Sequence, residues 1–163
     1  MRTIRATLFA LLAAPVLAAL CAPSQAQEQS WETQFLLIAN PCLVSEAPNK
    51  LALCQQANTD LLARAASYPG PLPKHEDNVY RAMRAMLAIH IAAEMGKADG
   101  VRSQRSCVAI EQGWSDASVI DTQYSPQRAA DLQSIRSDVL RAARLCRQEF
   151  GKMPSWAPDL PAS

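Results

Sequence analysis

The apolar residues of this chain recur at helical spacing in several segments, which proline, glycine and polar residues separate. The longest segment runs from Asp77 to Met95, and its second half is apolar on almost every side, interrupted only by His90. A helix without a polar face must be buried on most sides, and charges near both ends make this segment a poor membrane span. We therefore expect it to be the central helix of a small bundle.

Shorter patterns predict four further helices, and period-two alternation typical of strands is absent. The expected helices run from the cap Ser30 to Asn40-Pro41, from about Pro48 to Ser67, from Asp99-Gly100 to about Gly113, and from Pro126 to Phe150, with Gly96 ending the central helix. We expect a stiff connector at 68–74 and an irregular segment at 114–124. The predicted fold is all-α, an up-and-down bundle of four main helices and a short N-terminal helix.

The first 26 residues are typical of a secretory signal peptide. Arg2 and Arg5 precede an apolar run, and small residues come just before a cleavage point at Gln27. Lipidation at Cys21 is the alternative, although Leu20 is bulky for the position before a lipidated cysteine. We expect residues 27–152 to form the helical domain and residues 153–163 a proline-rich, disordered tail of a periplasmic or secreted protein, exported as in Gram-negative bacteria.

Four cysteines remain after signal cleavage, and an even number in an exported chain predicts two disulfides. In an up-and-down bundle Cys42, Cys54, Cys107 and Cys146 all lie near the same end. We favour Cys42–Cys54 with Cys107–Cys146. The pairing Cys54–Cys107 with Cys42–Cys146 fits the topology nearly as well.

Charge and motifs exclude several functional classes. The cleaved chain carries 14 basic and 15 acidic residues, so neither nucleic acid nor an anionic membrane is an expected partner. The chain contains no G-x-S-x-G, S-x-x-K or H-E-x-x-H motif and no C-x-x-C pair. We therefore expect a protein that is not an enzyme, although an enzyme with an unrecognised site stays as an alternative.

One cluster on the central helix has the composition of a metal site. Met83, Met86 and His90 share a helix face, and thioethers with an imidazole select Cu(I). The same groups can ligate haem iron. Methionine is also an ordinary filler of helical cores. Core packing is thus the first interpretation, copper binding the alternative, and no cofactor is expected otherwise.

The function expected from these features is binding of another periplasmic or secreted protein. Inhibitors or immunity proteins of toxic enzymes, and adaptors or chaperones, have this size and lack of catalytic groups, which is an analogy only. Candidate contact residues are Trp114 and Tyr124 in the polar segment, because loops on a rigid scaffold often carry function. Arg81 and Arg84 form a small basic patch that could receive an acidic partner.

Overall fold

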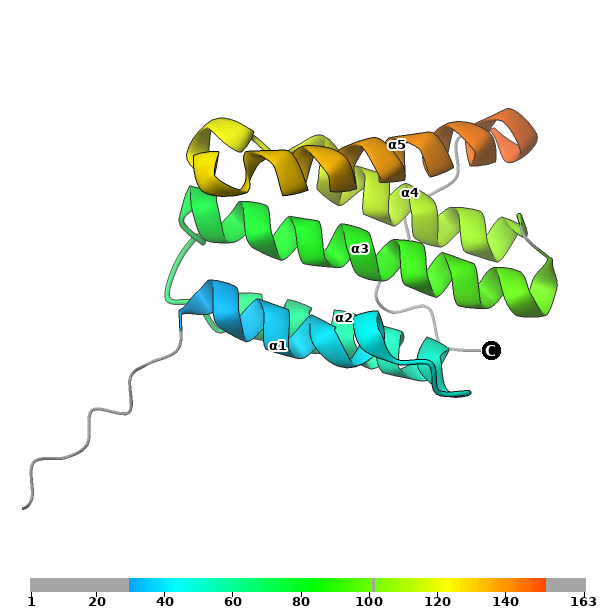
Figure 1. The fold of residues 1–163 in the computed structure, drawn as a ribbon, viewed down its shortest axis with the longest axis horizontal. Coiled ribbons are helices and arrows are strands. Elements are labelled where there is room, and N and C mark those ends of the chain that lie inside the picture. The colour runs from blue at the N-terminus through cyan, green and yellow to red at the C-terminus, as the bar shows by residue number, and fades with distance from the viewer. Residues whose placement is uncertain (1–29, 101, 152–163) are drawn as a thin grey trace, which may run out of the picture.

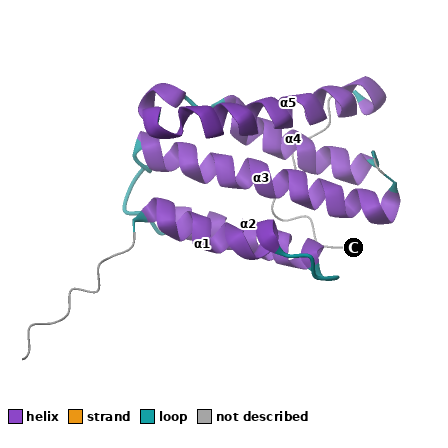
Figure 2. Cartoon of the chain, viewed as in Figure 1, coloured by secondary structure: helices purple, strands orange, loops and turns teal. Residues whose placement is uncertain are grey.

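The computed structural model describes residues 30–100 and 102–151, which form five α-helices and no strand (Figures 1 and 2). The helices are α1 (Trp31–Val44), α2 (Lys50–Ala66), α3 (Lys74–Asp99), α4 (Gln104–Ser118) and α5 (Ala129–Phe150). Two short 3-10 turns, η1 (Thr122–Tyr124) and η2 (Pro126–Arg128), connect α4 to α5. The predicted all-α bundle is confirmed. The expected signal peptide and tail lie outside the described residues.

Helix α3 is the centre of the bundle. It packs against the four other helices, with α1 and α2 on one side and α4 and α5 on the other (Figure 1). Twelve of its 26 residues are buried, among them Leu87 and Ile91. This burial on several sides is what the nearly continuous apolar pattern of the segment predicts.

A glycine brings α4 close to α3. A Cβ atom added at Gly113 would lie 2.9 Å from Cβ of Ala88 and 3.3 Å from the carbonyl oxygen of Ala85. These distances are shorter than ordinary van der Waals contact, so a residue without a side chain is required here for the two helices to pack.

Several predicted helix boundaries are wrong, because packing overrides local signals. Helix α1 continues through Pro41 to Val44, since the flanking Ala39 and Cys42 are fully buried and Cys42 is bonded to α2. Helix α3 continues through Gly96, which is buried, and ends at Asp99.

Asp99-Gly100 therefore ends α3 and does not open α4. Gly100 adopts a φ of 101° and donates its backbone N–H to the carbonyl of Gly96 at 3.0 Å. The N-cap of α4 is Ser103, whose hydroxyl accepts a hydrogen bond from the backbone N–H of Ser106 at 3.1 Å.

The segment expected to be irregular is mostly ordered helix. Helix α4 runs to Ser118, with Asp116 and Ala117 buried, and the buried Ile120 follows it. The helix expected from Pro126 instead begins with the 3-10 turn η2 and becomes α-helical at Ala129. The polar composition of residues 114–124 predicted an irregular segment, but α4 remains helical there because it buries its charged groups in ion pairs.

Both favoured disulfides are confirmed, and the alternative pairing is excluded. Cys42–Cys54 joins α1 to α2 with a Cα–Cα distance of 4.6 Å, and Cys107–Cys146 joins α4 to α5 with a distance of 5.4 Å. The helices alternate in direction, so both bonds lie at the end of the bundle where α3 ends (Figure 1). Each bond therefore joins the two helices that lie on one side of α3.

Among residues 30–100 and 102–151, no helix combines the length and hydropathy that crossing a membrane requires.

Candidate functional site

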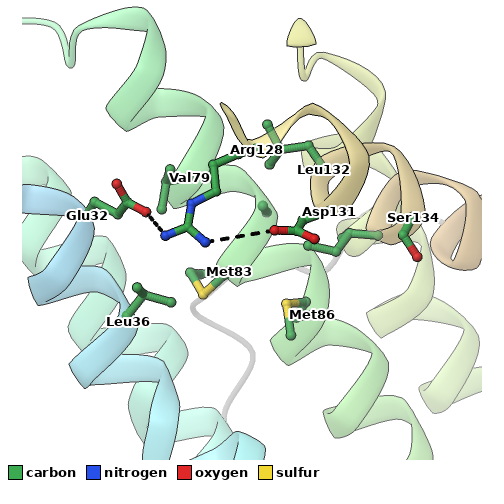
Figure 3. A pocket seen from close by; sticks show the side chains of 11 residues that line it. Glu32, Leu36, Val79, Met83, Met86, Arg128, Asp131, Leu132 and Ser134 are labelled. Atoms are coloured by element: carbon green, nitrogen blue, oxygen red, sulfur yellow. Dashed lines mark hydrogen bonds and ion pairs between the residues drawn. The ribbon is translucent and has the colours of Figure 1, made fainter. Parts of the chain in front are cut away.

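An apolar hollow opens between α1 and α5, with α3 as its floor (Figure 3). Its volume is about 350 Å³. The lining residues come from all three helices and from η2: Glu32, Leu36, Val79, Ala82, Met83, Met86, Arg128, Asp131, Leu132, Ser134 and Ile135. Most of them are apolar, and the charged ones gather at the end where α1 begins. The hollow can therefore receive an apolar group flanked by charge.

The hollow continues along the seam between α3 and α5. Met86 and Ile135 also line a second hollow, together with Ile89, His90 and Asp138. Ile89 in turn lines a third hollow of about 620 Å³ that reaches Cys146 at the disulfide end. The three shared residues place the hollows one after another along the seam, and we call this row of hollows the α3–α5 groove. Its last part is also lined by Arg102, Ser106 and Ile110.

The groove follows from the patterns of its two helices. The second half of helix α3 is apolar on almost all sides, and α1, α2 and α4 cover only part of the apolar surface of the helix. The apolar stripe of α5 is wider than one buried face: Leu132 and Val139 are buried, whereas Ile135 and Ala142 are half-buried and Leu145 is exposed. The uncovered parts of the two helices face the same opening.

The three predicted copper ligands lie along this groove but do not all line one hollow. Met83 and Met86 line the first hollow, and Met86 and His90 line the second. Burial and the charge of Lys50 lower the pKa of His90, against the opposing charge of Glu94, so its imidazole is neutral at pH 7. Within the described ranges, no three His, Cys, Asp or Glu side chains are grouped as a metal site.

A polar network closes the groove where α1 begins. Glu32 is paired with Arg128, and its other carboxylate oxygen lies 3.3 Å from Nε2 of His75. Nδ1 of His75 lies 3.0 Å from Oγ of Ser125, which also accepts a hydrogen bond from Nδ2 of Asn78 at 3.0 Å. Burial raises the pKa of Glu32, but the hydrogen bonds and charges of His75 and Arg128 outweigh it and leave the pKa lowered.

Ser125, His75 and Glu32 contact one another in this order, but they resemble the catalytic triad of a hydrolase in residue type only. The Ser125 hydroxyl has no exposed surface, so no substrate reaches it in this structure, and Asn78 also holds the backbone of Asp121. The network therefore fixes the connection between α4 and α5 against α3. Ser125 precedes Pro126, a position where a serine hydroxyl is expected to cap the helix, but its hydroxyl makes these tertiary contacts instead.

The predicted partner-binding arginines are held in ion pairs. Nε of Arg84 lies 3.4 Å from the buried Asp116, and Arg81 lies 2.9 Å from Asp77 and 3.7 Å from Asp116. Burial raises the pKa of Asp116, and the charge of Arg84, a hydrogen bond from Gln112 and the charge of Arg81 oppose this effect. This arrangement joins α3 to α4.

The two predicted aromatic contact residues lie in different surroundings. Trp114 is half-buried, and the guanidinium of Arg147 lies 5.8 Å from its ring centre. Arg147 also pairs with Glu111 through two N–H donors, at 2.9 and 2.5 Å. Tyr124 is 47% exposed in η1. The structure does not bring Trp114, Tyr124 and the two arginines together as one surface, and their part in partner binding stays a prediction.

Sequence reasoning missed the groove residues outside α3, chiefly Leu36, Asp131, Ile135 and Asp138. A signal was available in α5, where apolar residues occur beside the seven-residue seam as well as on it. Which of these side chains remain exposed depends on the position of α1 in the folded protein.

No protein-family model, no curated protein and no solved structure matches this chain.

Proposed function

We propose that this is an exported protein without enzymatic activity that binds another periplasmic or secreted protein in the α3–α5 groove. The observation that carries the proposal is the groove itself, a largely apolar row of surface hollows between α3 and α5 in a bundle stapled by two disulfides. Inhibitors or immunity proteins and adaptors or chaperones are the functional classes that agree with it.

One disulfide and one ion pair favour binding because they fix the two ends of the groove before a partner arrives. Cys107–Cys146 ties α5 to α4 at one end, and the Glu32–Arg128 pair links α1 to the start of α5 at the other. A preformed apolar surface loses little conformational entropy on association, which raises affinity for a given contact area.

Export is supported by the pattern of the first 26 residues and by the disulfides. Structural disulfides persist in oxidising compartments such as the periplasm and are rare in the cytosol. Two bonds that join four buried cysteines are therefore in keeping with an exported protein.

The proposal is tested by capture on the immobilised cleaved protein from a periplasmic extract. We expect the wild type to retain a protein and the Met86→Glu variant to lose it, because a carboxylate in the groove opposes apolar docking. Leu37→Glu is the matched control: Leu37 is an exposed apolar residue of α1 that does not line the groove. Retention by Met86→Glu, or catalytic turnover by the purified protein without any captured partner, would contradict the proposal.

Copper binding is the second candidate function. It is favoured by the position of Met86, which lines one hollow with Met83 and another with His90, and by the neutral state of His90. Titration calorimetry of Cu(I) into the metal-free protein tests it. Binding tighter than about micromolar that is lost in Met86→Leu would support copper, whereas weaker binding would end the idea.

A further inference from the structure

The α3–α5 groove also points to the chemistry of its occupant. We propose that a partner inserts an amphipathic helix carrying two basic residues about seven positions apart beside its apolar stripe, and that these residues pair with Asp131 and Asp138. This inference rests on the proposed function, since it assumes that the groove binds a protein.

Both walls of the groove follow the spacing of helix-packing seams. Among the α5 residues that line the groove, five alternate by four and three positions: Asp131, Ile135, Asp138, Ala142 and Leu145. On α3 the same alternation is followed by five of the lining residues: Val79, Met83, Met86, His90 and Ala93. Two parallel seams of this kind leave a position into which a third helix packs its own apolar side chains.

The length of the groove suits a short helix. From Val79 to Ala93 the α3 wall spans roughly 20 Å at the helical rise, which is about four turns. An extended strand would not find backbone partners there, because both walls are helices whose backbone groups bond within themselves. The occupant is therefore helical.

The charges of the α5 wall select a basic helix. The side chains of Asp131 and Asp138 are 71% and 56% exposed, and among the described residues each is ion-paired with one exposed arginine three positions away, Arg128 of η2 at 3.8 Å and Arg141 of α5 at 3.5 Å. Such exposed pairs are weak, and Arg128 is shared with Glu32. The two carboxylates are thus available, two turns apart, along one edge of the groove.

Three stapled helical peptides of about 18 residues test the inference. All carry the same leucine stripe. The first has two lysines seven positions apart beside the stripe, the second has glutamates at those positions, and the third has the two lysines on the face opposite the stripe. We expect the first peptide to bind the cleaved, oxidised protein about tenfold more tightly than either of the others, with a difference that shrinks in high salt.

Matched variants assign the effect to the two carboxylates. Asp131→Asn with Asp138→Asn should abolish the preference, whereas Gln133→Lys with Ser137→Lys should keep it. Both double variants change the net charge by the same amount, and Gln133 and Ser137 are exposed residues of α5 that do not line the groove. Circular dichroism checks that all the proteins are folded.

Each other outcome has a distinct meaning. Equal binding of the three peptides would overturn the charge inference and leave the groove as a binding surface. Binding of none of them up to millimolar concentration would overturn both proposals. A dimer of the protein alone that dissociates in Met86→Glu, measured by sedimentation, would make a second copy the occupant and would also overturn the inference.

Discussion

Removing the two disulfides one at a time should destabilise the bundle by different amounts. Cys42–Cys54 closes a loop of 12 residues in sequence separation, and Cys107–Cys146 closes one of 39. The chain-entropy relation gives about 3 kcal/mol for the shorter loop and about 4 kcal/mol for the longer one at 25 °C. All four cysteines are at least 95% buried, so replacement by alanine adds a small packing loss at both sites.

The expected order is therefore wild type, then Cys42→Ala with Cys54→Ala, then Cys107→Ala with Cys146→Ala as the least stable. Equilibrium urea unfolding followed by circular dichroism measures the free energies, and the slope with urea reports any change in the unfolded state. A loss below about 1 kcal/mol for either pair, or the reverse order, would refute the assignment of the stabilisation to loop closure.

The same variants separate stability from binding. Cys146 lines the groove at the disulfide end, whereas neither Cys42 nor Cys54 lines it. We therefore expect loss of Cys107–Cys146 to weaken binding of a groove peptide more than loss of Cys42–Cys54, at a temperature where both variants remain folded. Equal weakening would mean that the bond at the groove does not hold it in shape.

Two further predictions concern the helix contacts. Gly113→Ala should destabilise the fold by about 1 kcal/mol by thermal unfolding, because the overlap with Ala88 outweighs the higher helix propensity of alanine; a more stable variant would refute the close contact. Since the pKa of Glu32 is lowered on folding, its ionised form stabilises the native state above the ordinary value of 4.5, and this contribution is lost as the pH falls through the lowered pKa. Urea unfolding across this acidic range should show a smaller loss of stability for Glu32→Gln than for the wild type.

The sequence alone determined the fold class, the number of helices and the end of the bundle where the cysteines meet, and the structure chose between the two disulfide pairings that this left. A nearly all-apolar segment such as 85–93 can only be stable when other elements surround it, so a central helix follows from burial alone. Because successive helices alternate in direction, the four cysteines lie at one end of the bundle, and few disulfide pairings are possible. These conclusions depend on periodicity and chain direction, which are local or topological properties.

Tertiary structure decided the helix ends, the role of Ser125 and the position of the groove. Pro41 and Gly96 are local stop signals, but both lie inside helices because buried neighbours hold the backbone in place. Whether Ile135 and Asp138 face solvent or another helix depends on how far α1 lies from α5 across α3. That distance is set by side chains from segments far apart in sequence, and no local pattern encodes it.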